Sequence, residues 1–161
     1  MLTPANPDFA QRVRDSFQLQ NAMHLIQARL EQVTPGNVTI VLPHWTGVEQ
    51  QHGFIHGGVV GMIADSAAGY AAMSLVSADA SVLTVEYKLN LVAPADGDRL
   101  IARGKVVRPG KTLSITQAEV LAERNGQEIL CALMQQTIMV MRGKSEKPDQ
   151  AARTSKPLTT N

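Results

Sequence analysis

Asp65 is the residue whose type and surroundings most clearly suggest chemistry. It lies in a stretch rich in glycine, alanine and large apolar residues, from Gly53 to Ala78, in which no other side chain carries a full charge near neutral pH, His56 apart. An ionised carboxylate is costly in such surroundings unless a partner compensates it or it takes part in a reaction. Asp65 is therefore either a reacting group or a structural residue on a single polar stripe that bonds a loop amide.

The triplet His56-Gly57-Gly58 is the second such feature, and Gly57 precedes Asp65 by eight residues. Two glycines let a ligand approach the backbone closely. If a helix begins here, its first N–H groups have no intrahelical acceptor and lie at the positive end of the helix dipole. Such a place suits a carbonyl oxygen that becomes an oxyanion during acyl transfer. The alternative is a tight turn from loop to helix.

One helix cannot bring Gly57 and Asp65 to the same reacting atom. Eight residues at about 1.5 Å each separate them by roughly 12 Å along the axis, whereas reacting atoms must approach to about 3–3.5 Å. If both serve one reaction, Asp65 must come from a second copy of the chain. Two antiparallel helices about a two-fold axis would form two identical sites, and the small residues of this segment would allow their close approach.

Two helices are predicted to frame this region. The chain of 161 residues suffices for one domain with one core. Asn6 followed by Pro7 predicts an N-cap and the first position of a helix that ends near Gln20. The segment from Gly57 to about Ser74 predicts a second, longer and buried helix.

Strands are predicted for most of the remaining chain, because apolar residues alternate there between turn signals. The expected strands cover residues 25–33, 38–42, 83–91, 100–107, 113–121 and 128–141. Asn125-Gly126 is the strongest hairpin signal of the chain. Two strands before the long helix and four after it, all compatible with antiparallel pairing, indicate the α+β class.

Composition argues against several kinds of protein. Fifteen Lys and Arg against fourteen Asp and Glu leave a formal charge of +1, without the basic field that nucleic-acid or polybasic membrane-surface binding needs. Cys131 is the only cysteine, so it forms no intramolecular disulfide, and we expect a small core residue rather than a nucleophile. No signal peptide is visible, and Asp65 argues against a membrane-spanning segment. We expect a cytoplasmic protein.

The stretch from Gln50 to Ala67 resembles the signature of hotdog-fold acyl-CoA thioesterases, specifically the phenylacetate-degradation (PaaI-like) group. Residues 84–90, 94–95 and 106–112 resemble later strands of that family, and the resemblance covers about residues 16–141. It implies a long central helix wrapped by a six-stranded antiparallel sheet, with two protomers pairing into one continuous sheet. We expect an N-terminal helix and extension in residues 1–15, a hotdog domain in residues 16–142 and a disordered tail in residues 143–161.

The same resemblance implies roles for five residues. The amide of Gly57, aided by His56, would polarise the thioester carbonyl. Asp65 of the partner would be the nucleophile or the general base, and both roles stay open because sister groups place Glu there. Gln50 would orient the thioester or the water, and Thr84 falls near a strand position that often carries a hydroxyl for the attacking water.

Four more residues are expected to bind substrate. Gly58 follows the glycine that polarises the carbonyl, and Arg108, Lys111 and Thr112 flank a turn that could hold the phosphates of coenzyme A, as basic residues do in relatives. A solvated basic turn explains these three residues equally well.

No metal or prosthetic group is expected, and coenzyme A enters as part of the substrate. His52 and His56 are four residues apart but lack a nearby third ligand. Ser66 and Ser81 lack the Gly-x-Ser-x-Gly arrangement of serine hydrolases.

The sequence thus predicts hydrolysis of an aromatic or short- to medium-chain acyl-CoA by a homodimer with shared sites, assembled into a homotetramer. Two alternatives remain: a hydratase or dehydratase of the same fold, and a non-catalytic acyl-CoA sensor, which would not need Asp65.

Overall fold

A computed structural model describes residues 2–143, in which one curved sheet packs against a long helix. The helices are α1 (Phe9–Gln18), α2 (Asn21–Leu25), the 3-10 helix η1 (Thr46–Val48) and α3 (Gly57–Met73). The strands are β1 (Arg29–Thr34), β2 (Asn37–Pro43), β3 (Ala80–Leu91), β4 (Arg99–Arg108), β5 (Leu113–Arg124) and β6 (Gln127–Arg142). Of the predicted tail in residues 143–161, only Gly143 belongs to the described part of the chain.

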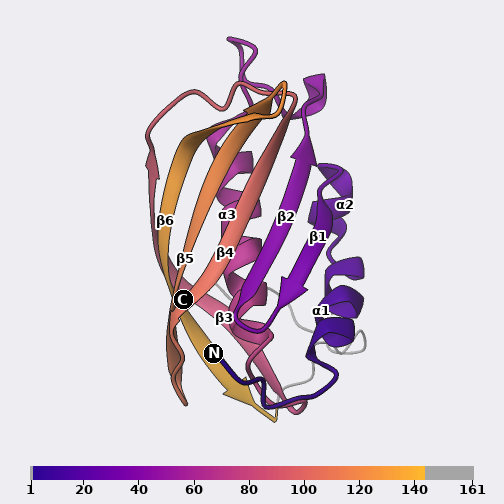
Figure 1. Cartoon of the computed structure of the whole chain (residues 1–161), viewed down its shortest axis with the longest axis vertical. Helices are drawn as coiled ribbons and strands as arrows, with labels where there is room; N and C mark the ends of the chain where they lie inside the picture. Colours follow the sequence, from indigo (N-terminus) through magenta and orange to yellow (C-terminus); the bar gives the residue numbers. More distant parts are fainter. Residues whose placement is uncertain (1, 144–161) are drawn as a thin grey trace, which may run out of the picture.

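The six strands form one antiparallel sheet in the order β1-β2-β4-β5-β6-β3, so β1 and β3 are its two edges. In Figure 1 the central strands pass in front of α3, while α1 and α2 lie beside β1. This is the arrangement that the resemblance implies: a central helix wrapped by a six-stranded antiparallel sheet, with an N-terminal helix. The prediction of an α+β hotdog fold is confirmed.

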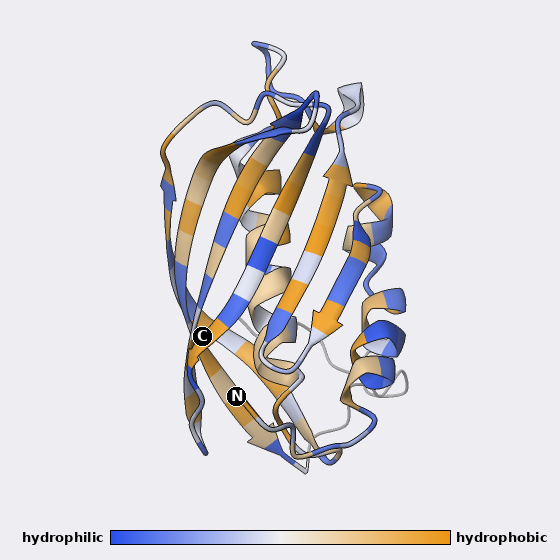
Figure 2. Cartoon of the chain, viewed as in Figure 1, coloured by the Kyte–Doolittle hydropathy of each residue, from blue (hydrophilic) through white to orange (hydrophobic). Residues whose placement is uncertain are grey.

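The long helix α3 confirms the helix predicted from Gly57, and its C-cap is Ser74. Most of its residues are buried, because the sheet covers it along its length. Figure 2 shows apolar residues along α3 and β2, and more hydrophilic residues along α1 and β1. None of the helices within residues 2–143 has the length and apolar character needed to cross a lipid bilayer.

The helix and the sheet touch through their backbones where β4 crosses α3. A Cβ atom placed on Gly104 would lie 2.3 Å from the carbonyl carbon and oxygen of Ala67, far inside van der Waals contact. A glycine is therefore required at this position of β4 by the close approach of α3.

A β-bulge interrupts the pairing of β3 with β6 at Val85. Thr84 pairs with Ile138 and Glu86 with Thr137, so Val85 is the additional residue. The bulge breaks the strict alternation predicted for residues 83–91. Thr84 consequently faces α3 together with Tyr87, a residue three positions later.

The N-terminal helix begins later than predicted. Its N-cap is Asp8, and α1 starts at Phe9 rather than at Pro7. Asn6 instead accepts a hydrogen bond from the Asp8 N–H through its side chain (3.1 Å), which closes a turn ahead of the helix.

The prediction of one strand over residues 25–33 is also wrong in its first part. Residues 21–25 form the short helix α2, whose Met23 is buried while Leu25 is exposed. The strand begins at Arg29, after Gln27 adopts a positive φ of 63° that ends the helical turn. Leu25 thus belongs to a helix that tertiary packing of Met23 stabilises, which the alternation of apolar residues did not reveal.

Candidate active site

Asp65 lies in the middle of α3, and its carboxylate is held by two side chains from neighbouring strands. Thr84 of β3 donates a hydrogen bond to Oδ1 (2.7 Å), and Gln136 of β6 donates a second one to the same oxygen through Nε2. The Asp65 carboxylate is therefore compensated by hydrogen bonds from the sheet. The structural alternative considered from the sequence, a hydrogen bond with a loop amide, is not found within residues 2–143.

The second oxygen of Asp65, Oδ2, has no hydrogen-bond partner within residues 2–143. No fully buried side-chain oxygen in that part of the chain lacks a partner, so Oδ2 is accessible to solvent. One oxygen is thus fixed and the other is available to a water molecule or a substrate.

Sequence reasoning missed two polar residues that support this carboxylate. Gln136 is 1% exposed, and its Nε2 is also 2.9 Å from the Thr84 hydroxyl. Thr116 of β5 is fully buried and donates a hydrogen bond to Oε1 of Gln136 (3.0 Å). A signal existed, because Gln136 alternates in phase with the apolar residues Met134 and Ile138 and was therefore bound to face the core.

The first residue of α3 offers a free backbone donor. The Gly57 N–H has no acceptor within residues 2–143, and the first turn of α3 contains no acidic residue. The positive end of the helix dipole is therefore not neutralised by a side chain. This N–H can donate to an oxygen on which negative charge develops.

His56 is the N-cap of α3, and its side chain accepts a hydrogen bond from the Gly58 N–H at Nδ1 (2.9 Å). The Gly58 amide is thus used within the cap. Because Nδ1 is the acceptor, Nε2 is the nitrogen that carries the ring proton. The His56 side chain is exposed, so its N–H and that of Gly57 are two donors at the same helix end.

Gln50 belongs to the loop that precedes α3. Its side-chain oxygen accepts a hydrogen bond from the His52 N–H (2.7 Å), and its backbone N–H bonds the carbonyl of Phe54 (2.8 Å). Within residues 2–143, no hydrogen bond joins Gln50 to Asp65.

Asp65 and Gly57 lie on one line along α3 that faces the edge strand β3. Gly57, Gly61, Asp65 and Gly69 follow one another at intervals of four residues. A Cβ on Gly57 would be 2.8 Å from Leu91, and one on Gly61 would be 3.3 Å from Leu89. The unbroken helix between Gly57 and Asp65 keeps them about 12 Å apart along its axis. A single chain therefore does not bring the two groups together.

A hollow of about 270 Å³ opens beside Asp65. Its lining comes from α3, from the start of β3, from Ile138 of β6 and from Gln20, and Asp65 is its only charged member. Gly69 lines it as well, and a Cβ on Gly69 would meet no atom within 4 Å. The hollow therefore continues past the carboxylate along the helix, and Ser66 and Ser81 are among its other lining residues.

The basic turn between β4 and β5 is distant from Gly57 in the same chain. Arg108, Lys111 and Thr112 are all exposed. Lys111 borders a shallow depression together with Leu75 and Val76, which follow the C-terminal end of α3. The turn thus lies at the end of the helix opposite Gly57.

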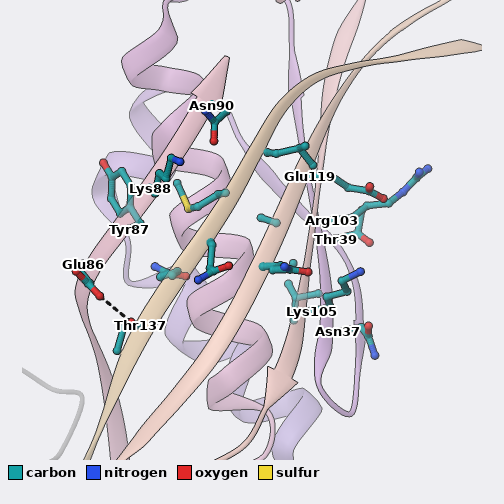
Figure 3. A pocket seen from close by; sticks show the side chains of 18 of the residues that line it. Asn37, Thr39, Glu86, Tyr87, Lys88, Asn90, Arg103, Lys105, Glu119 and Thr137 are labelled. Atoms are coloured by element: carbon teal, nitrogen blue, oxygen red, sulfur yellow. Dashed lines mark hydrogen bonds between the residues drawn. The ribbon is translucent and has the colours of Figure 1, made fainter. Parts of the chain in front are cut away.

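A larger hollow, of about 790 Å³, lies on the face of the sheet that points away from α3 (Figure 3). Charged and amide side chains line it, among them Lys88, Arg103, Lys105, Glu86 and Glu119. Their strand neighbours, such as Val38 and Ala118, are buried in the core. This face holds none of the residues predicted for catalysis.

Cys131 is buried in β6 and donates a hydrogen bond to the carbonyl of Val120 (3.2 Å). Burial raises the pKa of its thiol to about 11, which keeps the thiol protonated near neutral pH. The expectation of a core cysteine is confirmed. Within residues 2–143, no cluster of three or more His, Cys, Asp or Glu side chains could hold a metal ion.

Comparisons with known proteins agree with the fold. Residues 52–129 match the model of the thioesterase superfamily. A crystal structure of a thioesterase family protein from Silicibacter pomeroyi is 45% identical, covers 84% of this chain and 99% of its own, and superimposes with a TM-score of 0.82. The PaaI protein of the phenylacetic acid degradation operon of Escherichia coli is 18% identical, over 87% of this chain and 98% of its own, with a TM-score of 0.77, which shows a shared fold.

A curated relative from Halobacterium salinarum, whose name gives only a provisional esterase assignment, is 29% identical over 97 residues. The match covers 57% of this chain and 64% of that relative, so this chain spans somewhat less than two thirds of its length.

Proposed function

The chain belongs to the thioesterase superfamily, a family of thioester hydrolases, and on this premise we propose that it hydrolyses acyl-CoA to a free acid and coenzyme A. The observation that carries the proposal is the carboxylate of Asp65, with Oδ1 fixed by Thr84 and Gln136 and Oδ2 open beside a hollow.

The proposed reaction uses Asp65 of one protomer and the helix start of its partner. The Gly57 N–H, with the His56 Nε2–H beside it, would bind the thioester oxygen as negative charge develops on it. Asp65 Oδ2 would take a proton from water, whose oxygen attacks the carbonyl carbon, or would itself attack that carbon to form an anhydride that water then hydrolyses. Both routes break the C–S bond and release the thiolate of coenzyme A, which is then protonated.

A shared site requires a dimer, and the edge strand β3 supports one. The β3 edge has no strand partner within residues 2–143, although it is twelve residues long. Leu83, Val85, Tyr87 and Leu91 on this strand are each 50–57% exposed. A long apolar edge of this kind is the form that a second strand covers. We propose that two β3 strands pair across a two-fold axis and thereby place Asp65 of one chain near Gly57 of the other.

The hollow beside Asp65 supports an aromatic or short- to medium-chain acyl group. A cavity of about 150 Å³ holds benzene in other proteins, and this hollow measures about 270 Å³. We propose that the acyl group occupies it, while Arg108, Lys111 and Thr112 bind the phosphates of coenzyme A. Gln50 would orient the thioester or the water. We also propose a cytoplasmic location and, as the resemblance implies, a tetramer of two dimers without a resident cofactor.

The test of the reaction is thiol release from a series of aliphatic and aromatic acyl-CoA substrates by the wild-type chain and by Asp65→Asn. We expect turnover to fall by about a hundredfold or more in this variant. Asp96→Asn, at an exposed carboxylate paired with Arg124, is the matched control and should retain activity. Full activity of Asp65→Asn would refute the catalytic assignment. Loss of an enoyl-CoA chromophore without thiol release would instead identify a hydratase.

The test of sharing uses Gly57→Pro as the second variant. Proline is tolerated at the first position of a helix and removes the N–H under study. The φ and ψ of His56, −60° and 134°, already suit a residue before proline. Each variant alone should be inactive. Random exchange of subunits between them should restore about a quarter of wild-type activity, because half of the dimers then contain one intact site. No recovery after exchange, verified by mass spectrometry, would refute the shared site.

A further inference from the structure

Gln136 and Thr116 are two of the few polar side chains buried in the described residues. A buried amide or hydroxyl costs free energy unless its hydrogen bonds are satisfied, and an apolar side chain of similar size would avoid that requirement. Both residues lie on the face of the sheet that packs against α3, in phase with core residues such as Ala118 and Ile138. Packing alone therefore does not explain why these two positions carry polar side chains.

The direction of the hydrogen bonds fixes the amide of Gln136. The Asp65 carboxylate can only accept hydrogen bonds, so it requires the NH₂ group of the amide on its side. The Thr116 hydroxyl donates to Oε1 on the opposite side (3.0 Å). An amide turned by half a rotation would place its oxygen against the carboxylate. The carboxylate thus selects the orientation of the amide, and the Thr116 hydroxyl, bonded to Oε1 on the opposite side, supports that orientation.

The same bonds fix the carboxylate. Gln136 and Thr84 both donate to Oδ1, and neither donates to Oδ2. Nε2 of Gln136 is also 2.9 Å from the Thr84 hydroxyl, so the three side chains form one hydrogen-bonded cluster. Rotation of the carboxylate about its last side-chain bond would break both bonds to Oδ1. Only one oxygen can then face the hollow.

We infer that Gln136 and Thr116 are positioning residues, which hold Oδ2 of Asp65 in the single orientation that faces the substrate. The inference rests on the proposed function of Asp65, but it concerns residues that do not line the hollow: Gln136 contacts Asp65 at Oδ1 rather than Oδ2, and Thr116 acts through Gln136. Supporting groups of this kind keep a reacting group within a few tenths of an ångström of its productive position. A displacement of about 1 Å can cost about a hundredfold in rate.

The first test replaces Gln136 by Met, which preserves the approximate size of the side chain but cannot donate to Asp65. We expect kcat to fall by about tenfold to a hundredfold and KM to change by less than about twofold, because the binding surface is intact. A crystal structure of Gln136→Met should show Asp65 in a changed or mixed orientation. An unchanged kcat, or an unchanged carboxylate in that structure, would overturn the inference.

The second test changes Thr116, which reaches Asp65 only through Gln136. It does not require that Gln136→Met folds. Thr116→Val removes the hydroxyl at nearly constant volume, and Thr116→Ser keeps it. We expect kcat to fall by about fivefold or more in the valine variant and to return to within about twofold of wild type in the serine variant. Equal loss of kcat in both variants would indicate packing alone and overturn the inference.

Ser114→Ala is the matched control, because Ser114 is a buried hydroxyl two residues earlier on the same face of β5 and binds only the Gly110 N–H (3.1 Å). It should lower the unfolding temperature without changing kcat. If Asp65→Asn kept its activity, the proposed function would be refuted. The orientation of Asp65 in the crystal structure of Gln136→Met would still test whether Gln136 positions the carboxylate. The two failures are therefore distinguishable.

Discussion

The two edges of the sheet are built differently. β1 is six residues long, carries Arg29, Glu31 and Gln32 as exposed side chains, and lies beside α1. β3 is twice as long, exposes a row of apolar side chains, and has no helix on its free edge within residues 2–143.

We expect the β1 edge to serve the stability of the fold and the β3 edge to serve function. The β1 edge is closed within the chain by a helix and by charges, which are two ways in which proteins protect an edge strand. The β3 edge is open, and β3 contacts the part of the candidate site around Asp65: the line of Gly57, Gly61 and Asp65 along α3, and the hollow, to which Thr84 contributes. The comparison predicts that changes at β3 abolish assembly and activity, and that changes at β1 affect folding alone.

Val85→Glu should have the largest effect. Val85 is the bulged residue of β3 and is exposed, and the hydrogen bonds to Asp65 come from Thr84 and Gln136. Burying an unpaired carboxylate in an interface costs several kcal/mol, so we expect the dissociation constant of the dimer to rise by about a thousandfold and turnover to fall with it. Light scattering coupled to size-exclusion chromatography measures the mass.

Gln32→Glu on β1 is the matched control for that change, since it adds the same charge to the other edge. It should leave both the mass and the activity unchanged. If Gln32→Glu dissociated the protein and Val85→Glu did not, the roles of the two edges would be reversed.

Phe17→Ala should have a large effect on folding and none on assembly. Phe17 is a buried residue of α1, and the centre of its ring is 5.9 Å from the centre of the Tyr70 ring in α3. Removal of a buried phenylalanine typically costs about 3–5 kcal/mol, which urea unfolding would detect. The oligomeric mass under native conditions should not change. A monomeric variant would show that α1 contributes to the interface.

Gly69→Leu should have a moderate effect, confined to substrate choice. The Cβ position of Gly69 is open and lines the hollow, so the new side chain should fill space without disturbing α3. We expect kcat/KM for the larger acyl groups to fall by about tenfold relative to acetyl-CoA. Gly69→Ala should show a smaller change in the same direction. An unchanged ratio of rates would place the acyl group elsewhere.

Glu123→Gln should have the smallest effect. A hydrogen bond from Arg99, followed by one from the Gly126 N–H, lowers the pKa of Glu123, and Arg99 also lies 3.8 Å from Glu31 of β1. A carboxyl with a lowered pKa stabilises the fold above its ordinary range and loses that contribution as the pH falls through the lowered value. The small difference between the variant and wild type, seen by urea unfolding at pH 7, should vanish at acidic pH. A difference that grew on acidification would contradict this.

The six strands were predicted from alternating apolar residues between turn signals, the first of them with a start four residues too early, and the long helix was predicted because its apolar stretch is too long for one strand. The Asn125-Gly126 hairpin signal is likewise confirmed, with φ of 54° and 77° at its two residues. The pattern did not predict the helix α2, which is stabilised by burial of Met23 rather than by a helical period. It did not predict the bulge at Val85 either, because alternation carries no information about an inserted residue.

The candidate site was predictable only in its helical part. Asp65 and Gly57 are conspicuous by their type within α3, whereas the alternation of β6 indicates that Gln136 faces the core but not which group it contacts there. The roles of Thr116 and Gln136 depend on the order of strands in the sheet, which places β5, β6 and β3 side by side under Asp65.

The contact between Gly104 and Ala67 determines how closely the part of α3 that carries Asp65 packs against the sheet. Ala67 is two residues beyond Asp65 on α3, and at this point the helix rests directly on the peptide backbone of β4. Even a methyl group at position 104 would act as a wedge and lift this part of α3 away from the sheet. The donors on β3 and β6 would then no longer reach the carboxylate. The absence of a side chain at one position of β4 thus determines the distance between Asp65 and the groups that hold it.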